Sequence, residues 1–276
     1  MIKKIAKHKK KFSIKVLVVI LSAVALTTLA IKASDKYLTD DKTNNGCSKE
    51  MVFIPTPEGG FCIDKYENSA GEKCTYTNPT NQLETRQNFD NIDCRPESQV
   101  GKIPWRNISQ NQAAAACAKA GKRLPTNKEW SQASLGTPDK DKDWSKDDCQ
   151  VAKNWNDQPG LTGSAKNCLS GQGVYDMVGN IWEWVEGDVV DGVYHGRVLP
   201  KEGFIDGIDE NGWPINTKED PNANYNNDYF WIKNKGTRGI ARGGYWDNQI
   251  SAGANSAYVV IEPSLAGEGI GFRCVK

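Results

Sequence analysis

The position of the cysteines limits what this chain can fold into more than any other feature. The chain has 276 residues, and all eight cysteines follow residue 46. An even number of cysteines in an exported chain predicts a framework of disulfide bonds. No Cys-x-x-Cys pair occurs and only two histidines are present, which argues against a structural zinc site. The cysteines are Cys47, Cys62, Cys74, Cys94, Cys117, Cys149, Cys168 and Cys274.

The N-terminal end of the chain has the features of an export signal or a membrane anchor. Residues 1–32 contain eight lysines and no acidic residue, and the run 16–31 is uncharged. We expect residues 1–15 to be a basic cytoplasmic tail and residues 16–33 to be a transmembrane anchor or a signal. An uncleaved anchor makes this a single-pass protein of the cell membrane with its C-terminal domain outside. Cleavage after Ala30 or Ala33 would instead release a secreted protein.

The rest of the chain is acidic. With the eight N-terminal lysines set aside, 27 of the 35 basic residues remain against 34 acidic ones, a net charge of −7. Proteins that bind nucleic acid usually present a basic face to it. We therefore expect no nucleic-acid partner, and we expect the membrane to be contacted through the N-terminal helix only.

Local patterns indicate where the folded part begins. Residues 34–46 are polar and lack apolar periodicity, which is typical of a linker, so we expect the folded domain over residues 47–276. Met51–Pro55 and Gly60–Asp64 indicate two short strands around a Pro/Gly turn, the pattern of a hairpin. A bond between Cys47 and Cys62 could join this hairpin.

Two helices are marked by capping boxes. Ser109–Gln112 precedes the alanine-rich stretch Ala113–Ala120, and Thr126–Glu129 opens a second helix that includes Trp130 and ends near Gly136. Much of the remaining sequence is rich in Gly, Asn, Asp and Pro, which predicts long loops. Nine tryptophans allow such a loop-rich domain to bury apolar area.

Four short motifs occur in order along residues 47–276. They are Phe61–Glu67; Gly121–Thr126 with Glu129-Trp130; Gly173–Trp184; and Arg242–Trp246 with Gly271–Cys274. Together they resemble the formylglycine-generating enzyme family, also called the sulfatase-modifying-factor family. The resemblance implies an α+β fold, a loop-rich and disulfide-bonded variant of the C-type lectin fold, which would follow the N-terminal transmembrane or signal helix.

The resemblance also bears on the disulfide bonds. It implies a bond between Cys117 and Cys274. Closeness in the sequence suggests two further pairs, Cys149 with Cys168 and Cys74 with Cys94.

A structural calcium site is implied as well. Its ligands would be Asp176, Gly179, Ile181 and Glu183. Two carboxylates and two backbone carbonyls are suitable oxygen ligands for calcium. The alternative is that Asp176 and Glu183 form hydrogen bonds at a turn and at the surface. For the family's other calcium site, Asn154 is the one visible candidate.

The chain departs from the enzymes at their catalytic centre. Those enzymes bind copper through two cysteines that lie between the Gly-Gly motif and the final Gly-Phe-Arg, and no cysteine occurs here between Gly243 and Gly271. Related members bind iron through histidines of an added helical domain, and this chain has a single histidine outside its basic tail. We therefore expect neither copper nor iron, assign no catalytic residue, and favour a protein that is not an enzyme.

The interior of the C-terminal region is unlike that of the enzymes. Residues 245–270 contain no arginine, although family members usually have arginines there. A fixed frame around such an interior resembles the variable proteins of diversity-generating retroelements, which present a ligand-binding surface on the same lectin-like fold. The expected surface consists of Tyr245, Asp247, Asn248, Ile250, Tyr258, Val260, Leu265 and Glu268.

These observations favour a surface-displayed protein that binds an unknown protein or other surface ligand. An enzyme of the same family with unrecognised chemistry and a structural subunit of an envelope assembly are the alternatives. The stretch Tyr258–Ile261 is apolar and β-prone, so alternate residues should face opposite sides of a sheet. A competing interpretation is that its tyrosine and valines fill the core.

Overall fold

Residues 46–276 are described by the computed structural model of the protein, in which Cys47–Lys276 form one structural unit. The predicted cytoplasmic tail, the segment 16–33 and the linker up to residue 45 lie outside the described residues. Within residues 46–276, no helix is both long enough and apolar enough to cross a membrane. The prediction of a membrane anchor therefore depends on the sequence alone.

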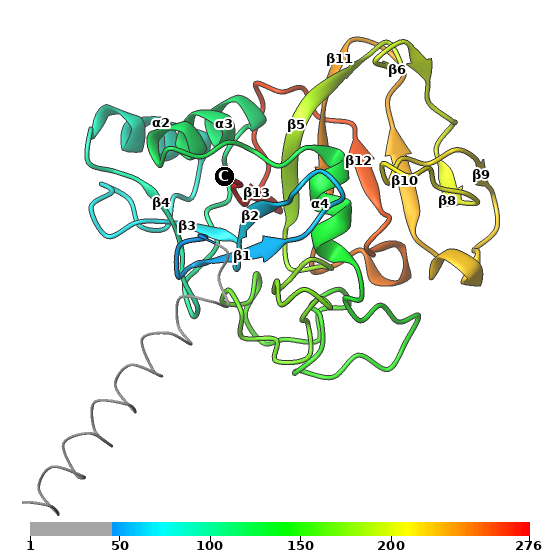
Figure 1. The fold of residues 1–276 in the computed structure, drawn as a ribbon, viewed down its shortest axis with the longest axis horizontal. Coiled ribbons are helices and arrows are strands. Elements are labelled where there is room, and N and C mark those ends of the chain that lie inside the picture. Colours follow the sequence, from blue (N-terminus) through cyan, green and yellow to red (C-terminus); the bar gives the residue numbers. More distant parts are fainter. Residues whose placement is uncertain (1–45) are drawn as a thin grey trace, which may run out of the picture. The chain divides into compact units, whose positions relative to one another are not determined.

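A nine-stranded sheet forms the centre of the domain (Figure 1). Its strands are β5 (Trp182–Val190), β6 (Val193–Tyr194), β7 (Arg197–Val198), β8 (Gly203–Ile205), β9 (Thr217–Lys218), β10 (Tyr229–Ile232), β11 (Thr237–Arg242), β12 (Ala257–Val259) and β13 (Ile270–Phe272). They lie in the order β7-β6-β5-β11-β12-β10-β8-β9, and β13 pairs with β5. Most neighbours are antiparallel, whereas β10 with β12 and β13 with β5 are parallel.

Smaller elements surround this sheet. The strands β1 (Met51–Ile54) and β2 (Phe61–Asp64) form the hairpin that the Pro/Gly turn predicts, and β3 (Asn68–Ala70) pairs with β4 (Pro96–Ser98). Two short 3-10 turns are η1 (Ala223–Tyr225) and η2 (Gln249–Ser251). The described domain is mostly β with few helices and has four disulfide bonds, so the expected loop-rich, disulfide-bonded α+β fold is confirmed in part.

The helices are α2 (Gln82–Asp90), α3 (Gln110–Lys119) and α4 (Asn127–Ser134). The last two begin at the predicted capping boxes, in which the side chain of the cap and that of the third helical residue each accept a backbone N–H of the other. The helix α2 was not predicted because its sequence has little apolar periodicity. The side chain of Asn81 caps it by accepting the N–H of Glu84.

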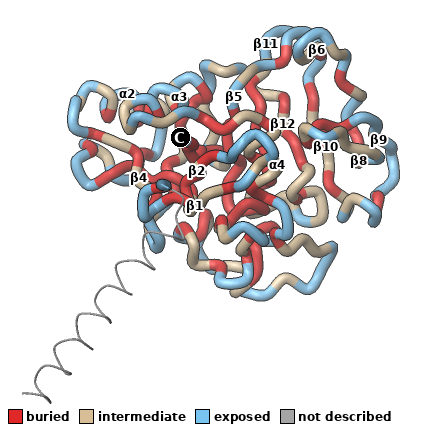
Figure 2. The backbone as a smooth tube through the Cα atoms, viewed as in Figure 1, coloured by how far each residue is buried: buried red, intermediate tan, exposed pale blue. Residues whose placement is uncertain are grey.

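The two faces of the sheet are covered by different elements. On one face, α4 and the β1–β2 hairpin pack against the central strands through residues such as Trp130 and Ile63. On the other face, α3 packs against β5 and β13 through Ala116, Trp184 and Phe272. Figure 2 shows buried segments running through the middle of the domain and exposed loops around it.

All eight cysteines lie among the described residues, and all are paired. The bonds are those that the sequence and the resemblance suggested: Cys47–Cys62, Cys74–Cys94, Cys117–Cys274 and Cys149–Cys168. The bond from α3 to Cys274 spans 157 positions. In the chain-entropy model a loop of that length contributes about 5 kcal/mol. Such bonds support a domain whose segment 135–181 contains no helix or named strand.

Residues 180–184 alternate between polar and large apolar side chains, which predicts a half-buried strand, but the structure buries both kinds. The buried polar residues are Asn180 and Glu183. Each polar side chain has a buried partner: Asn180 Nδ2 donates to Glu67 at 2.6 Å, and Glu183 pairs with Arg273. Trp246, a large apolar residue that we expect in the core from its place in the Arg242–Trp246 motif, is only partly buried.

Candidate functional site

The four sequence motifs meet at one buried ion pair. Arg273 donates to both carboxylate oxygens of Glu183, from Nε at 2.6 Å and from Nη2 at 2.5 Å. Its guanidinium also donates to the carbonyl oxygens of Asp64 at 3.0 Å and Tyr175 at 2.8 Å. Trp130 Nε1 donates to Glu183 at 2.7 Å. One guanidinium thus connects segments that are far apart in the sequence, and we call these five residues the central junction.

The predicted calcium ligands lie beside this junction. Asp176 is buried, its Oδ2 accepts the backbone N–H of Gly163 at 2.6 Å, and burial raises its pKa to about 7. Glu67 is also buried, and among the described residues its Oε1 has no hydrogen-bond partner. Burial, followed by the charges of Asp176 and Glu183, raises the pKa of Glu67 well above its usual range. One guanidinium therefore faces three buried carboxyl groups.

This arrangement fits a calcium ion in part. The excess of carboxyl groups favours a cation, and Asp176 with the carbonyls of Gly179 and Ile181 would supply oxygen ligands. Glu183 fits less well because both of its oxygens already accept hydrogen bonds from Arg273. Within residues 46–276, no group of three His, Cys, Asp or Glu side chains is arranged to hold a metal ion. Backbone carbonyls would have to complete the site, and calcium here stays a prediction.

Asn154, the candidate for the other calcium site, has a local structural role. Its Oδ1 accepts the backbone N–H groups of Val151 and Ala152, each at 3.3 Å. Its Nδ2 donates to the carbonyl of Ser145 at 2.7 Å. The side chain therefore holds together the loop in which it lies.

No thiol is available for the copper chemistry of the formylglycine-generating enzymes. Every cysteine is in a disulfide bond, and residues 245–270 contain none. A soft copper site needs thiolate ligands, which this chain does not provide while the disulfides are intact.

A cavity lined by aromatic side chains lies on the sheet face that α3 covers in part. Its volume is about 250 Å³, and seven of its nine lining residues belong to the segment 245–270. The lining residues are Trp182, Trp231, Tyr245, Asn248, Tyr258, Ile261, Gly267, Gly269 and Ile270. We call this the aromatic cavity.

A row of rings continues from the aromatic cavity across the sheet. Tyr258 stacks on Trp182 with ring centroids 5.4 Å apart and an interplanar angle of 29°. Trp231 meets Trp182 edge-on, also at 5.4 Å. Tyr229 lies 4.7 Å from Trp231, and Phe204 lies 4.9 Å from Tyr229. These five residues, from β5, β12, β10 and β8, are the aromatic strip.

Strand alternation explains where the strip lies. On β12, Ala257 and Val259 are buried in the core beneath α4, whereas Tyr258 packs on the opposite side. On β10, Phe230 is buried in that core, and Trp231 lies with Tyr258. The predicted alternation is confirmed for Tyr258 and Val259. Tyr258 itself is partly buried, so it lies at the margin of the core.

Three residues of the predicted binding surface line the aromatic cavity. They are Tyr245, Asn248 and Tyr258. Asn248 also has a structural role, since its Oδ1 accepts the backbone N–H of Tyr245 at 2.9 Å and so shapes the turn before η2.

The other predicted surface residues are exposed in full or in part and lie outside the aromatic cavity. Asp247 forms an ion pair with Lys153 at 2.8 Å, and Glu268 forms one with Arg106 at 3.3 Å. Exposed ion pairs of this kind contribute little stability. The remaining three are Ile250, Val260 and Leu265.

Two tryptophans of the aromatic cavity are absent from the predicted surface. Trp182 belongs to the motif Gly173–Trp184, and both it and Trp231 lie outside residues 245–270, in which the surface was predicted. No sequence signal separated the two faces of β10, because all four residues of Tyr229–Ile232 are large and apolar. In the structure, Tyr229 and Trp231 are partly exposed and Phe230 and Ile232 are buried.

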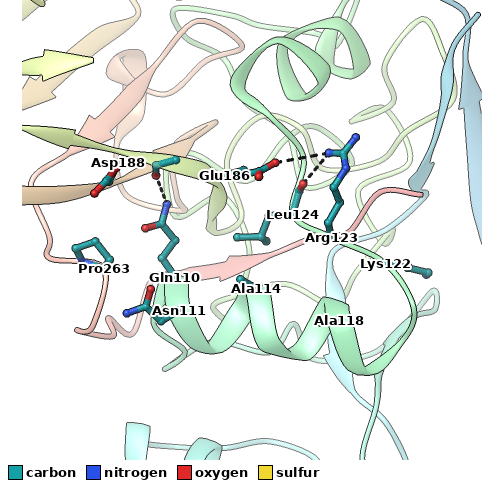
Figure 3. A pocket seen from close by; sticks show the side chains of 11 residues that line it. Gln110, Asn111, Ala114, Ala118, Lys122, Arg123, Leu124, Glu186, Asp188 and Pro263 are labelled. Carbon is teal, nitrogen blue, oxygen red and sulfur yellow. Dashed lines mark hydrogen bonds and ion pairs between the residues drawn. The ribbon is translucent and has the colours of Figure 1, made fainter. Parts of the chain in front are cut away.

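A second cavity, of about 330 Å³, lies between α3 and β5 (Figure 3). Two of its polar side chains, Gln110 and Arg123, contact residues of β5. Gln110 Nε2 donates to the carbonyls of Val185 and Gly187, each at 2.7 Å. Arg123 lies 3.9 Å from Glu186. None of the predicted surface residues lines this cavity, so the aromatic cavity is the stronger candidate for a ligand site.

Calcium bound at Asp176 and its neighbours should stabilise the domain. A chelator should therefore lower the melting temperature of the purified chain, since an ion that binds only the folded state adds RT ln(1 + [L]/Kd) to the free energy of unfolding. Asp176→Ala should reduce this drop, whereas Asp90→Ala, at an exposed position, should leave it unchanged. If the chelator lowers the melting temperature of the Asp176→Ala variant and of the unaltered chain equally, calcium does not bind at these residues.

Because Tyr258 is partly buried, we expect truncation of its side chain to lower the free energy of unfolding by an intermediate amount. Tyr258→Ala should lower the free energy of unfolding by about 1–2 kcal/mol, because a ring stacked at the margin of the core is lost. Phe272→Ala, at a fully buried position, should cost about 3–5 kcal/mol. Urea denaturation measures both. A cost for Tyr258→Ala equal to that for Phe272→Ala would place Tyr258 in the core and take it off the surface.

Comparison with known proteins supports the assignment of the family. Residues 55–276 match the model described as Sulfatase-modifying factor enzyme 1-like domain. The chain is 32% identical over 125 residues to the Bos taurus protein named Inactive C-alpha-formylglycine-generating enzyme 2, covering 39% of this chain and 40% of that one. It is 32% identical over 109 residues to the Formylglycine-generating enzyme of Thermomonospora curvata, covering 34% of each chain.

Among solved structures, the Major Tropism Determinant M1 Variant matches 83% of this chain and 52% of its own length, with a TM-score of 0.44 and 17% identity. The match to the two curated relatives spans less than half of either one. The family model, in contrast, covers most of the described domain. The chain belongs to the sulfatase-modifying factor enzyme 1-like domain family.

Proposed function

We propose that this chain is a membrane-anchored protein of the cell surface that binds a ligand through its C-terminal segment, as a variable protein of a diversity-generating retroelement. The observation that carries the proposal is the aromatic cavity, because residues 245–270 contribute most of its lining. A cavity built mainly from one segment changes its shape and chemistry whenever that segment changes.

Buried groups at both ends of this segment support the proposal. Before it, Arg242 is fully buried, and its guanidinium donates to the carbonyls of Ser256 at 3.0 Å and Ala254 at 3.1 Å. After it, Arg273 belongs to the central junction and Cys274 to a disulfide bond. These contacts use the backbone of the segment or residues beyond it. Its exposed side chains are therefore free to differ without loss of the fold.

The chemistry of the aromatic strip indicates what kind of ligand would bind. Tyrosine and tryptophan offer a large contact area at a low cost in side-chain entropy, and they are common at the centres of protein interfaces. Near the strip, Tyr229 Oη donates to Glu202 at 3.5 Å, and Asn248 lines the aromatic cavity. We infer a partner, either a protein or another surface ligand, that inserts an apolar or ring-shaped group into the aromatic cavity, against Trp182 and Trp231.

The proposed location follows from the sequence and is compatible with the disulfide bonds. The uncharged run 16–31 after a lysine-rich start would hold the chain in the cell membrane with the domain outside. Four disulfide bonds suit an oxidising compartment rather than the cytosol.

The retroelement origin is tested by sequencing the genome around the gene. We expect a near-copy of the DNA that encodes residues 242–276, differing from it at adenine positions, with a reverse transcriptase gene alongside. The differences should change codons of the exposed residues, such as Asp247 and Ile250, and should spare those of Arg273 and Cys274. A genome with neither the near-copy nor the reverse transcriptase gene would contradict this origin.

A further inference from the structure

Two aspartates meet in the domain at a distance from the central junction and the aromatic cavity. Asp139 lies in the loop after α4, and Asp228 directly precedes β10. Both carboxylates lie against the backbone of Gly253. A β-carbon at that glycine would be 1.6 Å from Asp228 Oδ1 and 2.4 Å from Asp139 Oδ2. The two carboxylates are therefore neighbours, and any side chain at position 253 would collide with them.

Each carboxylate uses one oxygen and leaves the other unpartnered. Asp228 Oδ2 accepts the backbone N–H of Asn255 at 2.8 Å, and Asp139 Oδ2 accepts that of Ala254 at 3.4 Å. The Oδ1 atoms of both are buried, and neither has a hydrogen-bond partner among residues 46–276. Asp228 as a whole is 0% exposed. Burying a carboxylate oxygen without a partner costs free energy of folding. The site therefore needs a proton or a cation that would satisfy these oxygens.

No basic side chain in the described part of the chain forms an ion pair with either aspartate. Lys140, next to Asp139, pairs instead with Asp148 at 2.9 Å. Arg242 donates to backbone carbonyls of the same loop rather than to the carboxylates. Burial, and then the charge of Asp228, raise the pKa of Asp139 to about 9, and burial raises that of Asp228 to about 6.

We propose that Asp139 and Asp228 hold a divalent cation, for which calcium is the best match. Calcium takes six to eight oxygen ligands, often a few carboxylates completed by amide oxygens and waters. Asn226 Nδ2 lies 3.5 Å from Asp139 Oδ2, and its amide, turned over, would direct an oxygen to the ion. This site shares no residue with the predicted calcium ligands Asp176, Gly179, Ile181 and Glu183.

An open cavity gives an ion a route to the pair. Its volume is about 470 Å³, and Asp139 and Asn226 line it together with Asp141 and Asp143. Lys140 and Lys142 of the same loop also line the cavity, so its acidic residues exceed its basic ones by one, and Lys140 is paired with Asp148. The cavity leaves room for bound waters beside the ion. In this position the ion would join the loop after α4 to residues 253–255, which lead into β12.

Calorimetry on the full chain tests the site. The chain is held in detergent, freed of divalent cations with a chelator, and titrated with calcium chloride. Asp176→Ala serves as the background, so that the other predicted site does not contribute. We expect one calcium per chain in this background. Adding Asp139→Asn or Asp228→Asn should abolish the binding, because asparagine has the shape of aspartate without its charge. Adding Asp90→Asn, at an exposed position on α2 that does not line this cavity, should leave the binding in place.

The competing explanation is a proton shared between the two carboxyl groups. In that case the background variant would give no binding heat, and calcium would leave its melting temperature unchanged, which would overturn the proposal. Binding that persists in both asparagine variants would overturn it as well, since the ion would then lie elsewhere. Near-ultraviolet circular dichroism confirms that each variant is folded. Asp139 is partly exposed, so its variant decides the matter if Asp228→Asn fails to fold.

Discussion

The fold depends on the buried pair of Arg273 and Glu183. A buried ion pair that loses one partner leaves an uncompensated charge, which costs about 3–5 kcal/mol. Here the guanidinium also satisfies two backbone carbonyls, so its loss would leave three acceptors without a donor and Glu183 Oε2 with the N–H of Trp130 alone. The neighbouring residues complete the arrangement: Phe272 fills the core next to α3, and Cys274 is bonded to Cys117 on that helix. Three consecutive residues thus fix the end of the chain in three different ways.

The start of the C-terminal segment is fixed by close packing. Gly243 and Gly244 have φ values of 94° and 90°, which favour glycine. A β-carbon on Gly243 would lie 2.9 Å from the carbonyl of Met177, and one on Gly244 would lie 2.4 Å from the β-carbon of Ala252. With both ends held in this way, and with Ala257 and Val259 packed in the core, the exposed side chains of residues 245–270 contribute little to the stability of the domain. A binding surface that tolerates change is physically possible only on such a support.

The sequence contained the information for elements with strong local signals. Ser109 and Thr126 marked the starts of α3 and α4 because a cap acts through neighbouring residues. The helix α2 was missed because its apolar residues have no helical period. Glu183 was assigned to calcium by resemblance, and the structure pairs it with Arg273, a partner that alternation along one strand could not reveal. Likewise Asp139 and Asp228 are unremarkable as isolated residues, and only the fold brings their carboxylates together against Gly253.

The central claim is that a rigid frame carries a surface that is free to vary. Displaying two libraries of the chain and measuring the fraction of clones that resist protease tests it most directly. One library randomises the predicted surface positions Tyr245, Asp247, Ile250, Tyr258, Val260, Leu265 and Glu268. The other randomises frame positions of the same number, including Trp130, Glu183, Phe272 and Arg273. We expect most clones of the first library and few of the second to stay folded. Equal losses in the two libraries would contradict the claim.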